Sequence, residues 1–420
     1  MKLKTVLDEQ LNQIQLEKEV FKKISETANN FVKQLQNKLS KKGIAAEVFI
    51  GGSLAKNTLV KKDTYDADIF VRFDEKYDDS RISKILGKIL SRKAKKLHGS
   101  RDYYQLNIDG ILIEVVPVTK IKQPEDARNV TDLSYFHVNY VLGKNKKNKK
   151  LKNEIILAKA FCHAQNAYGA EGYVKGFSGY SIELLICHYG SFEKFLQAIQ
   201  KLKPDEKIII DDAKFYKKNN VLQELNNAKL QSPIILIDPT YKQRNALAGL
   251  SNERLNKFKT VAKKFLQNPG SEFFVKKGIL KDLKEKYKEK LEILVVQTNR
   301  QAGDISGTKS KKFFEFFKYK LKREFVILEA EFEYSEEKNY AGFYFVVNKK
   351  KDETIKGPSL KDTQNVARFK KMHEQSFVKN NRICAKLSHN INFEGFLKKF
   401  VQKEKKIIKS MSIKKISLLR

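Results

Sequence analysis

The amino-acid sequence predicts an α+β protein with more than one domain. Its 420 residues exceed one typical domain, and 41% of them are apolar, which is enough to build buried cores. The spacing of the apolar residues changes along the chain, from a helical period to short runs with period two and back again. No apolar run approaches the roughly 20 residues of a membrane-spanning helix, so no membrane partner is expected.

The first third of the chain combines a helix with short strands. Residues 1–42 place apolar side chains at steps of three, four or seven, which predicts one long amphipathic helix. The run at 48–50 ends at a Gly-Gly-Ser turn, and 66–73 alternates with period two. Both segments are therefore predicted to be strands.

Two further strands are predicted at 103–108 and 111–116. They are joined by Asp109-Gly110, a strong signal for a two-residue hairpin turn. Residues 1–143 are therefore expected to form one α+β domain around a largely antiparallel or mixed sheet.

A mainly helical region is predicted at 144–270. It begins with a run of lysines over 144–152, which we interpret as a solvated linker rather than as a dedicated RNA-binding segment. Asn268-Pro269-Gly270 marks its end.

Residues 271–420 are expected to form a basic α+β part. A strand, a helix over 310–321 and two strands are predicted within 291–348, followed by a helix near 366–372 and a strand near 382–387. The four phenylalanines within 313–317 have helical spacing, so we expect them to lie in a core rather than stack on bases. The segment 398–420 carries nine Lys or Arg residues against one Glu.

The net charge indicates a polyanionic partner. Lys and Arg number 84 against 49 Asp and Glu, which gives +35. A field of this sign suits nucleic acid first and an anionic membrane second, although a lysine-rich proteome would also raise it. The start of the chain has no apolar signal core, and Cys162, Cys187 and Cys384 cannot form a disulfide framework. We therefore expect a cytoplasmic protein. A homodimer is compatible with the sequence, which leaves the oligomeric state open.

The sharpest motif is Gly52-Ser53, followed by Asp66-Ala-Asp68 and later by Glu114. Glycine lets the backbone approach a ligand closely, and a helix that opens at Ser53 would direct free N–H groups at an anion such as a triphosphate. Asp66 and Asp68, two apart on a strand, project from one face. Two such carboxylates repel unless a divalent cation lies between them, and hard oxygen ligands suit Mg²⁺. Glu114 alone could equally belong to a solvated side of the hairpin.

This ordered set resembles the polymerase-β-like nucleotidyltransferase superfamily. Further motifs resemble the archaeal-type (class I) CCA-adding enzymes, which are tRNA nucleotidyltransferases. They are Glu114-Val-Val-Pro117, Asp132-Leu-Ser134-Tyr-Phe136-His137, Tyr168-Gly-Ala-Glu171, Gly176-Phe-Ser-Gly-Tyr180, His188-Tyr-Gly-Ser-Phe192, Asp238-Pro239 and Arg244-Asn245-Ala-Leu-Ala248. The resemblance implies a nucleotidyltransferase head at 1–143, a nucleotide-binding helical neck at 144–270, and a tRNA-binding body and tail at 271–420.

The resemblance also implies roles for individual residues. Asp66, Asp68 and Glu114 would be catalytic and would bind Mg²⁺, with Asp66 standing where Glu is common and Glu114 where Asp is usual. The nucleotide would be bound by Gly52, Ser53, Lys56, His137, Lys159, Tyr168 and Arg244. Lys56 replaces the usual Arg, which changes a bidentate contact into a point charge.

The implied activity is addition or repair of the 3′-terminal CCA of tRNA from CTP and ATP, with contacts to the acceptor stem and the T arm. A poly(A) or oligoadenylate synthase of the same superfamily and a catalytically inactive tRNA-binding protein are the alternatives.

Overall fold

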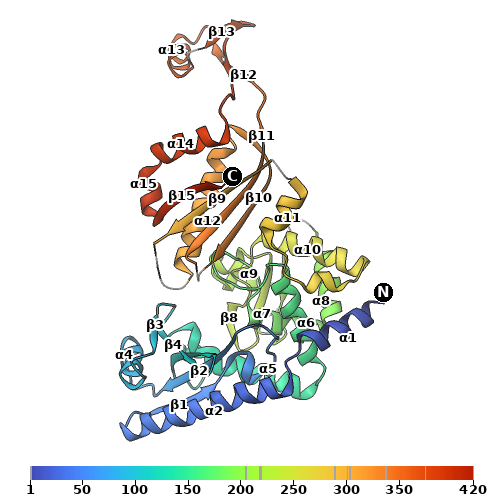
Figure 1. The fold of residues 1–420 in the computed structure, drawn as a ribbon, viewed down its shortest axis with the longest axis vertical. Helices are drawn as coiled ribbons and strands as arrows, with labels where there is room; N and C mark the ends of the chain where they lie inside the picture. The colour runs from blue at the N-terminus through green and yellow to red at the C-terminus, as the bar shows by residue number, and fades with distance from the viewer. Residues whose placement is uncertain are drawn as a thin grey trace. The chain divides into compact units, whose positions relative to one another are not determined.

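The computed structural model describes residues 2–203, 206–216, 220–287, 290–299, 301, 304–335, 338–373 and 375–419 (Figure 1). The chain divides into two compact units, Met1–Lys277 and Gly278–Arg420. The α+β prediction is confirmed, since helices and strands occur in both units. The finer division at 143 and 270 stays a prediction.

The first unit contains a five-stranded mixed sheet in the order β1-β2-β5-β4-β3. Only β2 and β5 pair in parallel, and the other neighbours are antiparallel. The strands are β1 (Ala46–Ile50), β2 (Tyr65–Phe73), β3 (Lys95–Leu97), β4 (Tyr103–Ile108) and β5 (Ile111–Thr119). Helices α2 (Lys18–Lys41) and α4 (Asp79–Ile89) contribute to the same apolar core as alternate residues of β2 and β5. Ala67, Ile69 and Val71 point into this core, so their neighbours point to the opposite face.

The predicted hairpin is confirmed. Asp109 and Gly110 join β4 to β5 with φ values of 52° and 82°. A two-residue turn with both φ values positive matches the twist of antiparallel strands, which explains the Asp-Gly pair.

The prediction of one helix over residues 1–42 is wrong. The structure has α1 (Leu3–Ile14) and α2, separated by extended backbone at Gln15 and Glu17. The break lets the two apolar faces enter different cores: Val6 of α1 packs among the later helices of this unit, whereas α2 packs along β1. Apolar spacing alone does not show that the two halves of the pattern serve different cores.

The rest of the first unit is mainly helical, as predicted. Its elements are α3 (Gly52–Ala55), η1 (Pro124–Asp126), η2 (Val130–Leu133), α5 (Ser134–Lys147), α6 (Leu151–Ala164), α7 (Gly179–Tyr189), α8 (Phe192–Lys201), α9 (Val221–Glu224), η3 (Asn227–Leu230), α10 (Asn252–Gln267) and η4 (Ser271–Phe274). A small sheet in the order β6-β7-β8 was not foreseen; its strands are β6 (Ile208–Ile210), β7 (Ile234–Asp238) and β8 (Tyr241–Asn245). Phenylalanines from α6, α8 and α10 fill the core. The lysine run falls at the end of α5 and the start of α6.

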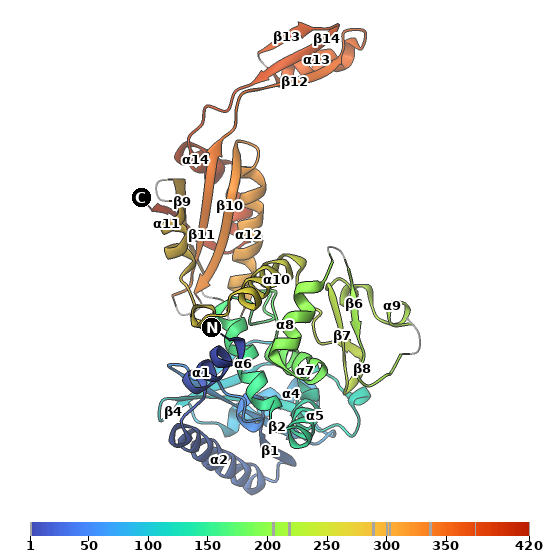
Figure 2. The ribbon, with the colours of Figure 1, turned by 90° about the vertical axis from the view of Figure 1, so that its right-hand side faces the viewer.

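The second unit is built on an antiparallel sheet in the order β10-β11-β9-β15, and Figure 2 shows α12 lying along its long hairpin. A second sheet has the order β12-β14-β13. The elements are α11 (Ile279–Tyr287), β9 (Leu291–Thr298), α12 (Ile305–Leu321), β10 (Phe325–Ser335), β11 (Tyr340–Lys349), β12 (Glu353–Ser359), α13 (Thr363–Met372), β13 (Ser376–Lys379), β14 (Arg382–Leu387), α14 (Phe393–Lys403), α15 (Lys405–Ser410) and β15 (Ile413–Leu419). Phe313, Phe314 and Phe317 are fully buried, which confirms the core prediction for α12.

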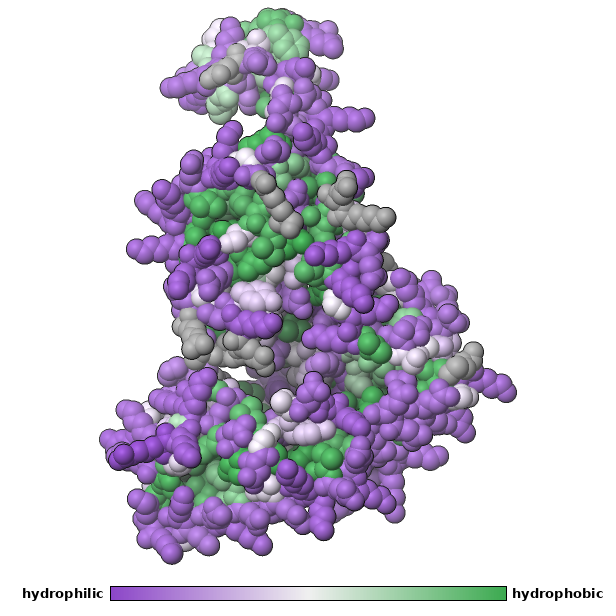
Figure 3. Space-filling model, viewed as in Figure 1, coloured by the Kyte–Doolittle hydropathy of each residue, from purple (hydrophilic) through white to green (hydrophobic). Residues whose placement is uncertain are grey.

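Hydrophilic side chains cover most of the face of the molecule seen in Figure 3. Within the described residues, no helix is long and apolar enough to span a bilayer.

Candidate active site

Three predicted carboxylates lie on one face of the first sheet. Asp66 and Asp68 alternate along β2 with buried Ala67 and Ile69, and the parallel register sets Asp68 directly opposite Glu114 on β5. All three side chains are partly exposed, whereas the other face of both strands is in the core. We call Asp66, Asp68 and Glu114 the acidic face. Its formation agrees with the strand periodicity read from the sequence.

The acidic face concentrates negative charge. Burial, followed by the charges of Asp66 and Glu114, raises the pKa of Asp68 to about 7. Lys62 forms an ion pair with Asp66, and Gln105 Nε2 donates to Glu114 Oε1 at 2.6 Å. Over the described part of the chain, no group of three His, Cys, Asp or Glu side chains has the arrangement of a metal site as it stands. Lys62 and Gln105 occupy carboxylate oxygens that a cation would need.

The Gly-Gly-Ser turn packs directly against Asp68. The Gly51 N–H donates to the Asp68 carbonyl at 2.8 Å, and α3 begins at Gly52 with a φ of 56°. A Cβ on Gly52 would lie 1.6 Å from Asp68 Oδ2, so no other residue fits there without moving the carboxylate. Ser53, the next residue of α3, is half-buried. The turn thus brings backbone and a helix start beside the acidic face.

Lys56 and Lys159 lie in one buried ionic cluster. Lys56 Nζ donates to Glu183 Oε2 at 2.6 Å, and Lys159 Nζ donates to Glu183 Oε1 at 2.7 Å. Lys159 also donates to Thr58 Oγ1 at 2.9 Å. We call Lys56, Thr58, Lys159 and Glu183 the lysine cluster. Sequence reasoning predicted the two lysines but missed Glu183, a charged residue inside the apolar run Ile182–Cys187 of α7.

His137 and Arg244 meet at a second buried carboxylate. His137 Nε2 lies 2.9 Å from Asp238 Oδ2, and Arg244 Nη1 donates to the same oxygen at 2.7 Å. The Tyr180 hydroxyl donates to Asp238 Oδ1, and its ring stacks on the His137 ring with centroids 4.0 Å apart. We call Asp238, His137, Tyr180 and Arg244 the Asp238 cluster. Burial lowers the pKa of His137 although Asp238 opposes that shift, which favours the neutral ring.

Tyr168 lies within electrostatic reach of these groups. The residue is partly exposed, whereas desolvation of its hydroxyl, and then the charges of Glu183, Asp66 and Asp68, raise the pKa of that hydroxyl, which therefore stays protonated. The charge of Lys56 in turn lowers the pKa of both Asp68 and His137. These effects couple the acidic face, the lysine cluster and the Asp238 cluster within the first unit.

Asp132, the first residue of the motif that ends at His137, stabilises the local fold. Its carboxylate pairs with buried Arg101 at 2.6 Å and accepts from the Thr119 N–H at the end of β5. It also accepts from the Asn129 N–H in a capping box at η2. These contacts fix the start of α5, which carries His137.

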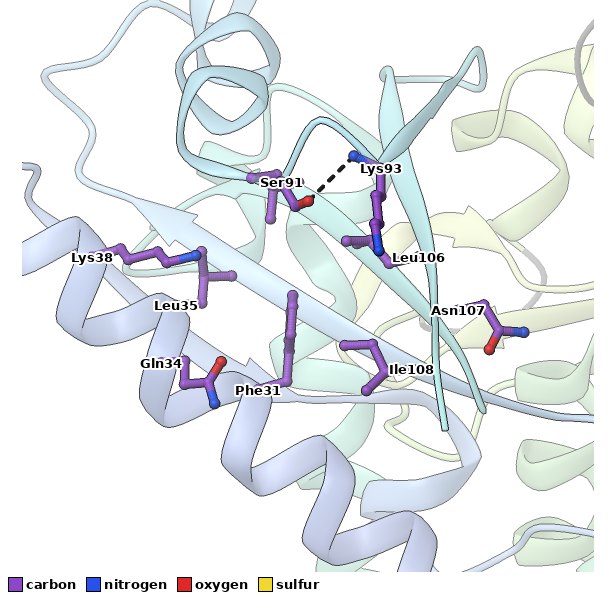
Figure 4. Close-up of a pocket in the computed structure, with 10 residues that line it drawn as sticks. Phe31, Gln34, Leu35, Lys38, Ser91, Lys93, Leu106, Asn107 and Ile108 are labelled. Atoms are coloured by element: carbon purple, nitrogen blue, oxygen red, sulfur yellow. Dashed lines mark hydrogen bonds between the residues drawn. The ribbon is translucent and has the colours of Figure 1, made fainter. Parts of the chain in front are cut away.

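The pocket shown in Figure 4 lies elsewhere. It has a volume of about 240 Å³ and is lined by α2, β4 and the segment after α4. Leu106 points into it from the core side of β4, opposite to the acidic face. We do not assign nucleotide binding to this pocket.

Comparisons with known proteins agree with this geometry. Residues 153–275 match the family described as tRNA nucleotidyltransferase, second domain. Residues 1–134 match the family described as Second Messenger Oligonucleotide or Dinucleotide Synthetase domain. The CCA-adding enzyme of Methanocaldococcus jannaschii is 30% identical over 91% of this chain and 87% of its own length. This chain belongs to the CCA-adding enzyme family. The family prediction from the sequence motifs is confirmed.

Other CCA-adding enzymes share shorter stretches. That of Nanoarchaeum equitans is 44% identical over 49% of this chain and 51% of its own length, so this match spans about half of that relative. The enzyme of Sulfurisphaera tokodaii is 33% identical over 64% of this chain and 61% of its own length.

Solved structures confirm the fold. The Cid1 poly(U) polymerase, bound to Mg and 3′-dATP, has a TM-score of 0.51 at 14% identity and covers 64% of this chain and 98% of its own. A cytoplasmic RNA terminal U-transferase has the same score over 66% of this chain and 99% of its own. The polymerase-β-like fold of the first unit is therefore shown. Enzymes of the nucleotidyltransferase family generally use divalent metal ions.

Proposed function

We propose that this chain adds or repairs the 3′-terminal CCA of tRNA, using CTP and ATP, in the cytoplasm. The observation that carries the proposal is the acidic face, together with the lysine cluster and the Asp238 cluster, in a chain that belongs to the CCA-adding family. Nucleotidyl transfer needs one region for the reacting oxygens, one for the triphosphate and one for the base, and these three sets of residues supply them.

The acidic face has the chemistry of a magnesium site. Its ligands are hard carboxylate oxygens. Second to burial, the charges of Asp66 and Glu114 help to raise the pKa of Asp68, and a bound cation would relieve this repulsion. Asp66, Asp68 and Glu114 would hold the metal. Bound Mg²⁺ would lower the pKa of the terminal ribose 3′-hydroxyl and neutralise the triphosphate and the leaving pyrophosphate.

The other residues of the site would place the nucleotide. Gly52 leaves room for the Asp68 carboxylate, and the backbone N–H groups at Gly52 and Ser53 would lie beside a phosphate held at the acidic face. Lys56 and Lys159 would offer their remaining ammonium hydrogens to the triphosphate. Tyr168, as a protonated phenol, would donate to the sugar or phosphate. Little covalent chemistry is required beyond holding these groups in line.

Base selection would fall to the Asp238 cluster. Arg244 is held by Asp238 and lies with its guanidinium carbon 5.5 Å from the centre of the Tyr180 ring. Held in this way, its remaining N–H groups would act as donors to the edge of the incoming base, and neutral His137 would contact the triphosphate or sugar. The basic second unit would bind the acceptor stem and T arm through shape and phosphate contacts.

Incubation with tRNA that lacks CCA, in the presence of Mg²⁺, tests the proposal. CTP alone should add two residues, ATP alone none, and both nucleotides together should complete CCA and stop. Continued addition from ATP alone would instead favour a poly(A) or oligoadenylate synthase. Binding of tRNA without any incorporation would favour an inactive binding protein.

A further inference from the structure

Glu183 is a buried anion that no part of the proposed mechanism yet uses. It lies on α7, is fully buried, and sits next to Ile182 and Leu184, which are also buried. Its two carboxylate oxygens each accept from a different lysine, Lys56 from the segment after α3 and Lys159 from α6. One carboxylate thus joins elements that are 127 residues apart in the sequence.

The charge balance of the lysine cluster leaves one positive charge in excess. The two ammonium groups lower the pKa of Glu183 against the opposing effect of burial, so Glu183 is ionised. Burial lowers the pKa of Lys159, and Glu183 counteracts that shift. Removal of Glu183 would therefore leave two close ammonium groups without a buried counter-ion, a costly arrangement.

The excess charge lies near the acidic face. Lys56 is the C-cap of the short helix α3, whose first residue, Gly52, packs against Asp68. The charge of Asp68 also favours the charged form of Lys159. An ammonium group has three donors. Among the contacts of the described residues, Glu183 and Thr58 account for two of those on Lys159, and Glu183 accounts for one on Lys56. Each lysine thus retains capacity for a phosphate oxygen while its direction is fixed by Glu183.

We propose that Glu183 is a positioning residue for the nucleotide triphosphate, which holds the Lys56 and Lys159 ammonium groups in one fixed orientation beside the acidic face. This inference rests on the proposed function, because it assumes a nucleotide triphosphate at that face. Glu183 itself does not touch the substrate. It acts by fixing the direction of both lysines and by opposing the loss of charge on Lys159.

The decisive variant is Glu183→Gln, which keeps size and removes the charge. Equilibrium dialysis of the full-length protein with Mg²⁺ would measure affinity for ATP, CTP and inorganic tripolyphosphate. We expect all three affinities to fall by a similar factor, about tenfold or more, because removing one partner of a buried charge pair is costly. Tripolyphosphate has no base or sugar, so its loss assigns the effect to the phosphates.

The pH dependence separates positioning from a general structural role. Lys159 is faced by Lys56, Glu183, Asp68 and Tyr168, and of these Glu183 most strongly favours its charged form. In Glu183→Gln the loss of tripolyphosphate affinity at alkaline pH should therefore begin at lower pH than in the parent. Glu183→Asp, which retains the charge, should keep this alkaline limb in place while weakening affinity less.

Glu404→Gln is the control for losing a carboxylate from an ion pair. Glu404 accepts from Lys320 Nζ at 2.7 Å in the second unit, which holds none of the proposed triphosphate ligands. The variant should lower the melting temperature and leave tripolyphosphate affinity and the alkaline limb unchanged. If Glu183→Gln behaves in the same way, Glu183 only ties helices together and the inference is overturned.

Two further outcomes keep the inference separate from the proposed function. If the parent binds ATP and Glu183→Gln weakens it, but no CCA is added to tRNA, the CCA-adding proposal fails while the role of Glu183 holds. If the parent binds none of the three probes, both fail. Should Glu183→Gln not fold, Glu183→Asp decides, because its shorter side chain cannot reach both lysines equally and unchanged tripolyphosphate affinity would overturn the inference.

Discussion

The acidic face and the helical part of the first unit arrange their charges in opposite ways. On β2 and β5, three like charges lie together and are partly open to solvent, and their repulsion contributes to the raised pKa of Asp68. Among the helices and at the end of β7, buried carboxylates are instead paired with cations: Glu183 accepts from two lysines, and Asp238 accepts from Arg244 beside the neutral ring of His137.

This difference separates groups that we propose to bind a cation from groups that we propose to be held in place before a nucleotide arrives. Like charges on a rigid strand face are unstable alone and gain most when a divalent ion binds. Cations that already have a buried anion are held in fixed directions and lose little freedom on binding phosphate or base. The comparison predicts that substitutions in the two regions affect different steps.

The largest effect is expected at the acidic face. Asp68→Asn should reduce nucleotide incorporation by several orders of magnitude. Loss of one ligand charge would weaken the metal's stabilisation of the transition state, which is on the order of several kcal/mol. Affinity for tRNA, measured without nucleotide, should remain, since distant cations supply most of it. Near-normal turnover in both Asp68→Asn and Glu114→Gln would mean that the acidic face does not hold the metal.

A smaller loss is expected when Asp68 is displaced rather than neutralised. Gly52→Ala places a Cβ 1.6 Å from Asp68 Oδ2 in the present geometry. Moving a reacting group by about 1 Å can cost roughly 10²-fold in rate. Gly43→Ala is the matched control: its φ is also positive, at 65°, but its Cβ would meet nothing within 4 Å. Single-turnover rates should fall for Gly52→Ala alone, and equal losses would assign the effect to backbone strain.

Part of the acidic face could be predicted from the sequence because its geometry is local. Asp66 and Asp68 lie two residues apart on a strand and must share a face. Glu114 joins them only through the parallel pairing of β2 with β5, which local spacing does not reveal, and its role was implied by the family resemblance. The α12 core could be predicted because helical spacing places its phenylalanines on one side. Local patterns therefore suffice where a single element decides the arrangement.

The lysine cluster could not be predicted in this way. Glu183 lies within an apolar stretch of α7 and meets Lys56 only because α3 and α7 pack together in the folded unit. Its one signal was a charge in the run Ile182–Cys187, where burial requires a partner. The break between α1 and α2 was missed for a related reason, because the two halves of one apolar pattern enter different cores. Long-range packing decides both.

A moderate and selective effect is expected in the Asp238 cluster. Arg244→Ala should impair the choice between C and A more than pyrophosphate release, because lost donors to a base edge cost roughly 1–3 kcal/mol of discrimination. Separate measurement of CTP and ATP incorporation, with UTP misincorporation, checks this. An equal loss for every nucleotide would give Arg244 a structural role and would weaken the distinction between the two regions.

The smallest effect concerns stability, and its sign should differ between the regions. Without added metal, the pKa of Asp68 lies above its unfolded value of 3.8, so stability falls as pH rises from about 4 to about 7. Asp68→Asn should therefore raise the melting temperature by a few degrees at pH 8.

The contacts of Asp238 with His137 and Arg244 outweigh the opposing effect of burial and lower the pKa of its carboxyl, so its ionised form stabilises the fold above pH 4. Asp238→Asn should therefore lower the melting temperature at pH 8, with the difference shrinking as pH falls below 4. Calorimetric scans of both variants test these signs. A lower melting temperature for Asp68→Asn at pH 8 would show that burial and the charges of Asp66 and Glu114 do not disfavour the ionised Asp68 carboxylate.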